Sequence, residues 1–253
     1  MRNDYLNNKK KINIGFVGGG KESSIGLTHR IASRMDSRYN ICAGVFSRNK
    51  NKSKNIAKRL GITEDRAYSN YKEMAYKESL RNDKILVVSI VTPPISHYRI
   101  AKFFLELGYN IICDKPLTEN IKQATKLKLL AKKKNLPFCV TYNYSGYPLV
   151  REAKELIKKG KIGKIININV EYLQGHIVGL NKKNIKKNLN WRSINSCGSL
   201  VLSEIGTHAF HMAEFVSGLK IEKVYADIES NFVKNVDDNA NVLLKFSKNA
   251  QGF

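Results

Sequence analysis

The first apolar run of the chain ends in three consecutive glycines, and this junction constrains the fold more than any other feature. Residues 12–17 form a short, mostly apolar segment, residues 18–20 are all glycine, and Ser23 or Ser24 can begin a helix. A buried parallel strand that meets a tight turn and then a helix has this pattern. Backbone N–H groups at such a turn can bind phosphate, because glycine allows close approach and the helix N-terminus carries partial positive charge. The junction therefore predicts the pyrophosphate site of a Rossmann fold.

The spacing of the glycines departs from the usual dinucleotide-binding pattern G-x-G-x-x-G. Gly18 and Gly20 supply the first two positions, but the next glycine is Gly26, three residues later than the pattern requires. A glycine turn that only connects a strand to a helix would also fit these residues. The position of the turn at the first strand of the chain favours the dinucleotide-binding interpretation.

The length and the charge of the chain limit what else it can be. Its 253 residues allow one large or two modest domains. The 44 lysine and arginine residues outnumber the 21 acidic residues and give a formal net charge of +23. Such a charge can bind nucleic acid, but the lysines are spread over most predicted helices, and no zinc-finger spacing or RNA-binding aromatic motif accompanies them. We therefore expect the charge to attract small anionic ligands, and we do not expect nucleic acid as a partner.

The spacing of the cysteines and the absence of long apolar runs predict a cytoplasmic protein. The sequence has no apolar run near the ~20 residues that span a bilayer, and its first residues lack the apolar core of a signal peptide. Cys42, Cys113, Cys139 and Cys197 are widely spaced, and the first three fall in predicted strands. We expect these three as buried thiols in a cytoplasmic protein that makes no membrane contact.

Apolar segments alternate with helical segments through the first half of the chain. Besides the first strand, strands are expected over residues 39–47, 67–68, 84–91, 110–113 and 137–141, and helices follow the glycine turn and cover residues 49–60, 70–80, 97–107 and 120–134. This alternation predicts an α/β fold with a doubly wound parallel sheet.

The pattern changes near Tyr142. A helix is expected over residues 148–159, a long strand over 165–174, a loop over 182–190, a mainly helical segment over 198–218, and half-exposed strands over 224–232 and 239–246. This mixture predicts an α+β domain with an open, mostly antiparallel sheet. We place the domain boundary so that residues 1–141 form the first domain and residues 142–253 the second.

Lys115 is the first candidate for chemistry. It follows the predicted strand over residues 110–113, and ligands of open α/β sheets bind at the carboxyl ends of the strands. Pro116 fixes the turn, and Asp114 places a carboxylate beside the ammonium group. A lysine here can hydrogen-bond a substrate hydroxyl or carbonyl and favour its alkoxide character. A surface lysine in a lysine-rich protein would give the same pattern.

Glu204 and His208 are four residues apart, which places them on one face of the predicted helix. His208 suits acid–base chemistry near neutral pH, and Glu204 can orient it or bind substrate. An ordinary pair on a helix surface is equally compatible. His211 is interpreted as a packing residue, because a metal would need a third ligand and the sequence nominates none. No metal site is expected.

A cofactor preference and a substrate class are indicated by two further groups of residues. Ser47 and Arg48 end the second strand, where NAD sites usually carry an acidic residue. A hydroxyl and a guanidinium suit a 2′-phosphate, which favours NADP(H), and NAD(H) stays the alternative if Arg48 only stacks on the adenine or reaches solvent. Tyr142, Asn143 and Tyr144 carry groups that suit polyol or sugar hydroxyls, although packing aromatics are equally compatible.

In this order, the motifs resemble those of the Gfo/Idh/MocA oxidoreductases, the relatives of glucose–fructose oxidoreductase and inositol dehydrogenase. The resemblance covers nearly the whole chain. It rests on residues 15–20 with Ile25, Gly26 and His29, on residues 91–94 with His97, on residues 114–116, and on Gly198 with Glu204 and His208.

The resemblance implies a Rossmann domain, then a domain with an open mixed sheet, and NAD(P)-dependent oxidation or reduction at a carbinol or carbonyl carbon of a sugar or cyclitol. Lys115 looks like the catalytic lysine of the family's E/D-K-P motif, and Glu204 and His208 look like its carboxylate and its acid–base histidine. The implied cofactor-binding residues are Gly18, Gly19, Gly20, Ile25, Ser47, Arg48, Thr92, Pro93, His97, Asp114 and Lys115. The implied substrate-binding residues are Tyr142, Asn143, Tyr144, Trp191 and Arg192. A homo-oligomer is a further expectation.

Three departures from the family pattern leave other functions open. The glycine loop is three residues longer, Glu204 stands where the family more often has aspartate, and the chain ends at Phe253, where relatives continue with more sheet and helix. We therefore expect either a fragment or a protein whose sheet a partner completes. A catalytically inactive nucleotide-binding or regulatory protein on the same fold is the main alternative function. Binding of nucleic acid through the basic surface is a weaker one.

Overall fold

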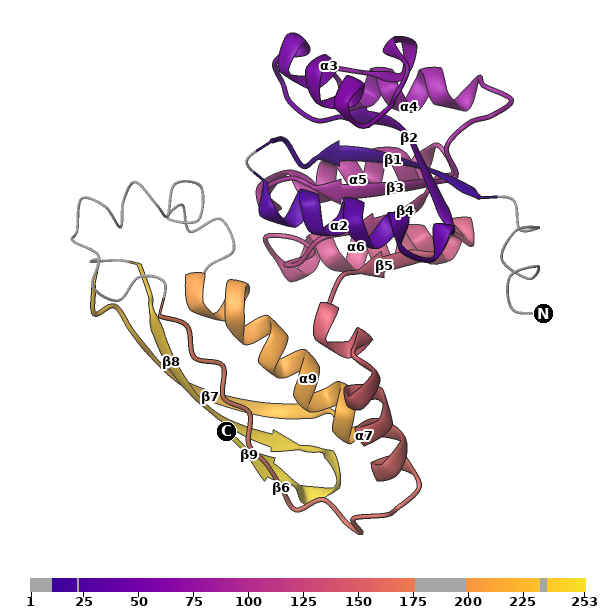
Figure 1. Ribbon diagram of the computed structural model, residues 1–253. Coiled ribbons are helices and arrows are strands. Elements are labelled where there is room, and N and C mark those ends of the chain that lie inside the picture. Colours follow the sequence, from indigo (N-terminus) through magenta and orange to yellow (C-terminus); the bar gives the residue numbers. More distant parts are fainter. Residues whose placement is uncertain (1–10, 22, 176–198, 233–235) are drawn as a thin grey trace. The chain divides into compact units, whose positions relative to one another are not determined.

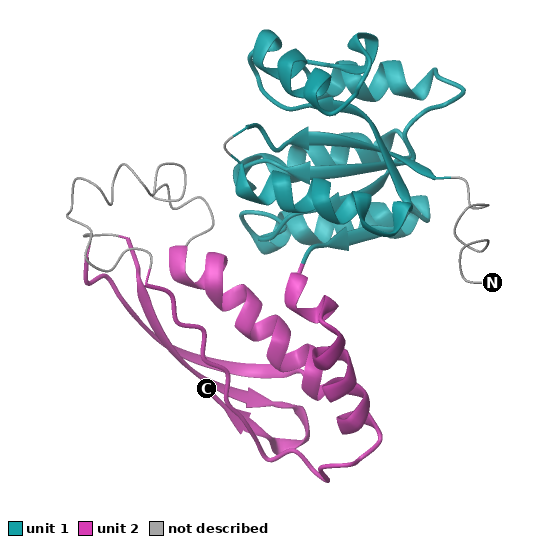
Figure 2. Cartoon of the chain, viewed as in Figure 1, with its two compact units in different colours: residues 1–141 teal, residues 142–253 magenta. Residues whose placement is uncertain are grey.

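The computed structural model describes residues 11–21, 23–175, 199–232 and 236–253, and Figure 1 labels its helices and strands. The chain divides into two compact units, residues 1–141 and residues 142–253 (Figure 2). Each unit has its own sheet and its own hydrophobic core. None of the helices in the described ranges has the length and hydropathy that crossing a membrane requires.

The first unit is built on a five-stranded parallel sheet. Its strands are β1 (Ile12–Gly18), β2 (Tyr39–Val45), β3 (Val87–Val91), β4 (Asn110–Cys113) and β5 (Phe138–Val140), in the spatial order β2-β1-β3-β4-β5. The chain runs outward from β1 to β2 and then returns to β3 on the other side of β1. The strand order therefore reverses between β1 and β3, and this is where ligands bind in open α/β sheets. The predicted parallel Rossmann sheet is confirmed.

The helices of this unit begin where the sequence places polar caps. They are α2 (Ser24–Arg34), α3 (Lys50–Arg59), α4 (Tyr71–Ser79), α5 (His97–Glu106) and α6 (Ile121–Lys134), with short 3-10 turns η1 (Met35–Ser37), η2 (Glu64–Arg66) and η3 (Pro94–Ser96). Side chains cap four of them by accepting a hydrogen bond from a backbone N–H, and these are Ser23, Asn49, Asn70 and Asn120. Such caps satisfy N–H groups that the first turn of a helix leaves without a partner.

The sheet is covered on both faces. Alternate residues of β1 enter different core clusters: Ile14 and Phe16 pack with Ala57 of α3, whereas Val17 packs with Phe104 of α5. Because β-strand side chains alternate between faces, a strand buried on both sides must be apolar at nearly every position. This is why the β3 segment reads as a near-continuous apolar run.

One strand expected in this unit is not part of the described sheet. Ala67 forms only an isolated parallel bridge with Gly44, and Tyr68 donates its backbone N–H to the Gly44 carbonyl at 2.9 Å. The buried Ser53 hydroxyl donates to the Tyr68 carbonyl at 2.6 Å and accepts from the Phe46 N–H at 3.0 Å. A side chain of α3 therefore satisfies backbone groups that a longer strand would pair with its neighbour.

The second unit carries a smaller mixed sheet. Its strands are β6 (Asn167–Ile168), β7 (Ile221–Glu229), β8 (Asn239–Phe246) and β9 (Gln251–Gly252), in the order β6-β9-β8-β7. The β7–β8 and β8–β9 pairs are antiparallel, and the β6–β9 pair is parallel. This confirms the expected open, mostly antiparallel sheet.

Two helices lie side by side over this sheet (Figure 1). The helical segments of the unit are η4 (Asn143–Gly146), α7 (Pro148–Lys158), the π-helical turn η6 (Leu202–Gly206), α9 (Thr207–Ser217) and the 3-10 turn η7 (Ser247–Asn249). The core beneath them is formed by Ala213, Leu219, Phe246 and Ala250. Strand β7 is exposed at every residue after the half-buried Ile221.

The long strand expected over residues 165–174 is wrong in its extent. Only residues 167–168 pair as β6, although Val170 still donates its N–H to the Phe253 carbonyl at 3.0 Å. The partner strand β9 is only two residues long, so the ladder cannot extend further. The alternation of apolar residues is present, but a ladder of hydrogen bonds is no longer than the shorter of its two strands.

The expectation of three buried thiols also needs correction. Cys113 is buried, but Cys42 is only half-buried and Cys139 is exposed. Cys139 lies on β5, an edge strand of the sheet, so one of its faces is open to solvent. Cys197, the expected loop over residues 182–190 and the start of the helical segment predicted from residue 198 lie outside the described residues.

Candidate active site

The glycine turn after β1 adopts a conformation that only glycine accepts readily. Gly18 and Gly19 have φ of +94° and +73°. A Cβ atom on Gly18 would also lie 2.6 Å from the carbonyl oxygen of Val91. A side chain at Gly18 is therefore excluded for two reasons: the backbone angles suit only glycine, and a Cβ atom would collide with β3.

Gly26 packs against the glycine turn, as the third glycine of the usual pattern does, although it lies later in the sequence. A Cβ atom on Gly26 would lie 2.3 Å from the Cα of Gly19, so helix α2 packs directly against the loop. The Ser23 hydroxyl oxygen accepts the N–H of Gly26 at 3.1 Å and caps this helix. Ile25, in the first turn, is 37% exposed. The longer loop thus keeps the close helix–loop approach on which pyrophosphate binding depends.

Arg30 also holds the glycine turn, and the sequence did not single it out. Its Nη1 donates to the Gly19 carbonyl at 2.5 Å, and the residue is buried. Burial lowers the pKa of Arg30, and the neighbouring Arg34 charge lowers it further. Nothing distinguished Arg30 from the many other basic residues of the chain, because its partner is a backbone carbonyl eleven residues away.

A hollow of about 400 Å³ lies at the carboxyl end of β2. Its lining residues are Gly20, Lys21, Ser23, Phe46, Ser47, Lys52, Asn55, Ile56 and Arg59. Ser47 is among them, as the sequence predicted, whereas Arg48 is exposed and is not. Among the described residues, three basic side chains line the hollow and no acidic one does, so the charge of this lining favours an anion. One face of α3 carries Lys52, Asn55, Ile56 and Arg59 at helical spacing. This spacing was visible in the sequence and would have allowed the two basic residues to be predicted.

His97 connects the loop after β3 with the turn after β4. The ring is fully buried, with Nδ1 2.9 Å from the Pro116 carbonyl oxygen and Nε2 2.7 Å from the Thr92 carbonyl oxygen. The Ser96 hydroxyl donates to the Thr92 hydroxyl at 2.7 Å. Because backbone carbonyls engage both ring nitrogens, His97 holds the Thr92–Pro93 loop and the Lys115–Pro116 turn in place, and we assign its ring no direct contact with a ligand.

Asp114 and Lys115 follow β4 at the same edge of the sheet as the glycine turn. One carboxylate oxygen of Asp114 accepts from the Thr141 hydroxyl at 2.9 Å, and the Asp114 N–H donates to the Ile90 carbonyl at 2.9 Å. Lys115 is half-buried. The predicted cofactor-binding residues of the first unit therefore gather at the carboxyl ends of β1 to β4.

In the second unit, three tyrosine rings surround His208. The rings of Tyr144, Tyr142 and Tyr172 stand edge-on to the imidazole, with centroid distances of 5.0, 6.0 and 6.1 Å. His208 is buried. The structure thus places Tyr142 and Tyr144 beside His208, as a shared site would require, and adds Tyr172.

The hydroxyl groups of Tyr144 and Tyr172 are 2.7 Å apart, and Gln174 Nε2 donates to the Tyr172 hydroxyl at 3.2 Å. The bond to Tyr172, with burial adding to it, raises the pKa of Tyr144 to about 12. The Tyr144 hydroxyl therefore stays protonated near neutral pH, and this pair of hydroxyls can bind a hydroxyl-rich ligand. Tyr172 was not predicted as a site residue, because it lies in a segment where only an alternating strand pattern was visible.

Tyr142 packs on His211, which supports the interpretation of that histidine as a packing residue. The two rings stack in parallel with centroids 4.1 Å apart, and His211 stacks in turn on Phe215. The Tyr142 hydroxyl lies 3.0 Å from the Thr207 hydroxyl, while the neighbouring Asn143 is exposed. Burial lowers the pKa of His211.

Glu204 lies on the π-helical turn η6, directly before α9, which carries His208. The helix expected over this region is therefore not a regular α-helix. A π-turn bonds each N–H to the carbonyl five residues earlier, and such turns recur at functional sites. Glu204 is half-buried.

Asp237 caps this helical segment from a distant part of the chain. Its carboxylate accepts from the Ser199 hydroxyl at 2.5 Å and from the backbone N–H groups of Leu200 and Val201 at 2.8 and 2.7 Å. These bonds fix the start of the segment that carries Glu204 and His208. The sequence could not reveal this, because the cap lies 36 to 38 residues after the helix start.

Trp191 and Arg192, predicted to bind substrate, lie outside the described residues. Within the described ranges, no group of three or more histidine, cysteine, aspartate or glutamate side chains could hold a metal ion.

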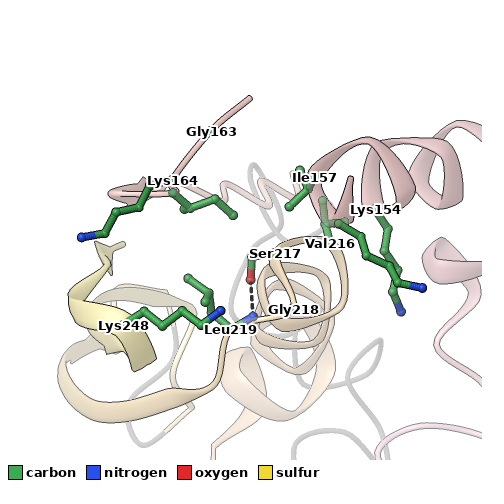
Figure 3. Close-up of a pocket in the computed structure, with 11 residues that line it drawn as sticks. Lys154, Ile157, Gly163, Lys164, Val216, Ser217, Gly218, Leu219 and Lys248 are labelled. Carbon is green, nitrogen blue, oxygen red and sulfur yellow. Dashed lines mark hydrogen bonds between the residues drawn. The ribbon is translucent and has the colours of Figure 1, made fainter. Parts of the chain in front are cut away.

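A second hollow, of about 540 Å³, lies between the ends of α7 and α9 (Figure 3). Lys154, Lys158, Lys164 and Lys248 line it together with Ile157, Ile165, Val216 and Leu219. The side chains of Lys154 and Lys164 extend to opposite sides in Figure 3, and the Lys154 ammonium lies 3.9 Å from the centroid of the Phe215 ring. These charges do not converge on one ligand position, so we assign no site here.

A parallel sheet with a glycine turn at its reversal point and a helix packed against that turn defines a dinucleotide-binding Rossmann protein. Residues 12–142 match the family model described as the oxidoreductase family with an NAD-binding Rossmann fold, and residues 150–253 match the GFO/IDH/MocA C-terminal domain. The chain belongs to the GFO/IDH/MocA oxidoreductase family.

Similar proteins span a range of activities. An uncharacterized oxidoreductase, YfiI of Bacillus subtilis, is 34% identical over 250 residues, which cover 96% of this chain and 63% of that protein. Levoglucosan dehydrogenase of Pseudarthrobacter phenanthrenivorans is 29% identical over 83% of this chain and 52% of that protein. An inositol dehydrogenase homolog of Azotobacter vinelandii, solved with NADH and myo-inositol, is 29% identical with a TM-score of 0.88 over 96% of this chain and 63% of that one. The chain thus spans less than two thirds of the length of these relatives.

Proposed function

We propose that this protein is an NAD(P)-dependent oxidoreductase that transfers a hydride between a nicotinamide and a carbinol or carbonyl carbon of a sugar or cyclitol. The observation that carries the proposal is the direct packing of Gly26 against Gly19, which places the N-terminus of α2 at the reversal point of the sheet. The names of the inositol and levoglucosan dehydrogenase relatives support the substrate class.

The residues at this edge fit a dinucleotide. The side-chain-free surface of Gly18 and Gly19 and the N-terminus of α2 would hold the pyrophosphate, with Ile25 beside it in the first turn. Thr92 and Pro93, held by His97, lie at the same edge. The bound nicotinamide supplies the site at which the hydride is accepted or donated.

We propose three residues for the chemistry. Lys115 donates a hydrogen bond to the substrate oxygen and stabilises negative charge on it. His208 exchanges the hydroxyl proton, since imidazole is an effective acid–base group near neutral pH. Glu204 orients the substrate or the imidazole. The three tyrosines that surround His208 limit the access of water to its ring.

The tyrosines beside His208 in the second unit would bind substrate hydroxyls. Tyr142, Asn143 and Tyr144 were predicted for this role, and the hydroxyls of Tyr144 and Tyr172 form a bonded pair beside His208. Trp191 and Arg192 stay part of the proposal without a structural description.

We also propose a preference for NADP(H). The lining of the hollow after β2, as far as the structure describes it, includes Ser47, Lys52 and Arg59 and no carboxylate. Cations and a hydroxyl suit a 2′-phosphate better than a 2′-hydroxyl. The Azotobacter vinelandii homolog was solved with NADH and with NAD+, so NAD(H) is the competing cofactor.

Fluorescence titration of the protein with NADPH and NADH tests the cofactor proposal. We expect saturable binding, tighter for NADPH, and its loss in Gly26→Ala. Gly146→Ala is the matched control, because a Cβ atom there meets no atom within 4 Å. Equal binding of both cofactors would remove the NADP preference, and failure of the folded protein to bind either would overturn the proposed function.

A panel containing myo-inositol, levoglucosan and D-xylose, followed by absorbance of the reduced cofactor, tests the reaction. Lys115→Met should lower kcat about 100- to 10,000-fold while the Kd of the cofactor changes little. Cofactor binding without turnover across the panel would favour the non-catalytic alternative, and a normal kcat in Lys115→Met would exclude the role of the lysine.

A further inference from the structure

A buried histidine joins the glycine-loop helix to the turn that carries Lys115. His29 lies on α2, one turn after Gly26, and its side chain is 10% exposed. Its Nδ1 lies 3.0 Å from the hydroxyl oxygen of Ser89 on β3, and its Nε2 lies 3.9 Å from a carboxylate oxygen of Asp114, directly after β4. A single imidazole therefore links three elements at the carboxyl edge of the sheet.

Ser89 is the only polar residue of β3, and it is 1% exposed. Its neighbours Val88 and Ile90 enter the large core on the other face of the sheet. A hydroxyl in the middle of a buried strand costs free energy unless it is hydrogen-bonded. The hydroxyl of Ser89 meets this requirement at His29, on the face where α2 packs.

The charge of Asp114 favours one tautomer of the ring. Its carboxylate oxygen lies 3.9 Å from Nε2, which is longer than a hydrogen bond, and a negative charge at this distance is stabilised by a hydrogen on Nε2 rather than by a lone pair there. Nδ1 then accepts the hydroxyl hydrogen of Ser89. Burial lowers the pKa of His29, and the nearby Asp114 charge opposes this without cancelling it. A lowered pKa keeps the ring neutral near neutral pH, which agrees with one ring proton.

The chain on both sides of Lys115 is held by other elements. Before it, Asp114 contacts His29 of α2 and accepts from the Thr141 hydroxyl after β5. After it, the Pro116 carbonyl lies 2.9 Å from Nδ1 of the buried His97 on α5. Lys115 thus lies between two neighbours that other elements hold, and its backbone is restrained on both sides.

We propose that His29 and Ser89 are positioning residues for Lys115: through the Asp114 carboxylate, they hold the turn that presents the lysine and couple it to the helix that binds the cofactor phosphates. The proposal rests on the proposed role of Lys115. His29 itself touches neither substrate nor cofactor. The serine sets the orientation of the imidazole, and the imidazole restrains the carboxylate.

Two matched pairs of variants separate positioning from plain packing. In His29→Asn the side-chain amide takes the place of Nδ1, so the contact with Ser89 is kept and the contact with Asp114 is lost. In His29→Gln the amide reaches the place of Nε2 and can still donate toward Asp114. Ser89→Ala removes the hydroxyl, whereas Ser89→Thr keeps it on a residue that suits a strand. Thermal unfolding identifies the members that fold.

The first measurement is a long-range ¹H–¹⁵N spectrum of the histidine rings in the wild-type protein. We expect His29 as the neutral tautomer with its hydrogen on Nε2. A hydrogen on Nδ1, or a doubly protonated ring at neutral pH, would overturn the proposal. This readout requires neither a substrate nor a cofactor.

The second measurement is competitive acetylation of lysines at neutral pH, read peptide by peptide by mass spectrometry. In His29→Asn and Ser89→Ala the carboxylate of Asp114 is no longer restrained beside Lys115, so the acetylation rate of Lys115 should rise about threefold relative to the wild type. Lysines of the second unit, such as Lys154, are internal standards. His29→Gln and Ser89→Thr should match the wild type. Unchanged labelling of Lys115 in folded His29→Asn would overturn the proposal.

The two hypotheses fail in different experiments. If the wild-type protein binds no nicotinamide cofactor, the proposed function fails, and the tautomer and the labelling pattern still test the arrangement of Ser89, His29 and Asp114. Where turnover is found, His29→Asn should lower kcat about tenfold while the KM for the cofactor stays within about twofold, because positioning acts on the chemical step. A change in the cofactor KM alone would contradict positioning of the lysine.

Discussion

The two units of the chain hold their candidate site residues in different ways. In the first unit the sheet is enclosed on both faces, and Ile14, Ile90 and Phe104 are fully buried. In the second unit the outer face of the sheet is open: Tyr225 and Leu243 are directly opposite on β7 and β8 and are 72% and 60% exposed. The first unit presents backbone groups at the edge of its enclosed sheet, and the second presents tyrosine side chains around His208 of α9.

This difference predicts which changes each unit tolerates. Phosphate binding at a glycine turn depends on backbone angles and close approach, which the enclosed sheet determines. The ring of His208 depends on a π-turn, on a cap 36 to 38 residues away and on three tyrosines. Substitutions should therefore separate cofactor binding from chemistry along the boundary of the units.

The largest effect is expected from His208→Asn. Loss of the proposed acid–base group should lower kcat about 100- to 10,000-fold, whereas the Kd of NADPH or NADH should stay within about twofold, because the proposed cofactor-binding residues belong to the first unit. Steady-state kinetics and fluorescence titration give the two numbers. His211→Asn is the control, since that ring packs on Tyr142 and should leave most of kcat intact. A parallel loss of cofactor affinity in His208→Asn would break the comparison.

Arg66→Met tests the enclosed unit. The guanidinium of the buried Arg66 donates to the Glu78 carboxylate at 3.0 and 2.6 Å, and Glu78 also accepts from the Tyr68 hydroxyl at 3.0 Å and from the Ile85 N–H at 3.2 Å. Removing one partner leaves a buried charge uncompensated, which typically costs about 3–5 kcal/mol. Calorimetry should show the transition of the first unit lowered and that of the second unchanged.

The matched control for this prediction is the double variant Arg66→Met with Glu78→Leu. Replacing both ions by apolar groups of similar volume is often neutral or stabilising, so much of the lost stability should return. If the double variant is as unstable as the single one, the network of bonds to Tyr68 and Ile85 determines the stability, and the ion pair does not.

The architecture of the first unit could be predicted because its signals are local. The caps Asn49, Asn70 and Asn120 stand directly before their helices, and the apolar run that ends at Val91 reports a strand enclosed on both faces. The glycine turn was recognised, but the sequence pattern alone left the late Gly26 ambiguous. Only the 2.3 Å approach to Gly19 reveals what it does.

The rest of the site depends on pairs of residues that are far apart in the chain. Ser89 and His29 are 60 residues apart, and Tyr144 and Tyr172 are 28 apart. Hydrophobic periodicity reports which face of an element is buried, but it does not report which polar groups meet once the elements pack. The length of β6 could not be predicted for the same reason, because it is set by β9, a neighbouring strand that is far from β6 in the sequence.

A smaller effect is expected from Asp237→Asn, which weakens the cap of the segment that carries Glu204 and His208. Loss of a cap costs about 0.5–2 kcal/mol, and the asparagine still accepts part of the hydrogen bonding, so we expect the lower end of this range. The second calorimetric transition should move and the first should not. A shift of the first transition alone would contradict the assignment of this cap.

The cap also predicts a pH dependence. Burial tends to raise the pKa of Asp237, but the bonds from Ser199, Leu200 and Val201 outweigh it, and the pKa lies below its usual value. A carboxyl whose pKa is lower in the folded state stabilises the protein above its unfolded pKa, which is about 3.9 for aspartate, and this contribution is lost as the pH falls through the folded pKa. The wild-type second transition should fall below about pH 4 more steeply than that of Asp237→Asn.

The smallest effect is expected from Tyr172→Phe, which changes one hydroxyl beside His208. The bond to Tyr172 is the largest cause that raises the pKa of Tyr144 to about 12, so without it this pKa should return toward the usual value of about 10. Ultraviolet difference titration against Tyr144→Phe isolates the signal of Tyr144. Tyr147→Phe is the control, because its ring also lies edge-on to that of Tyr144 but its hydroxyl forms no part of the 2.7 Å pair. If the titration of Tyr144 is unchanged in Tyr172→Phe, the second unit holds its tyrosines by ring packing alone. The two units would then differ more than the 2.7 Å distance implies, because only the first would rely on hydrogen bonds to hold its site residues.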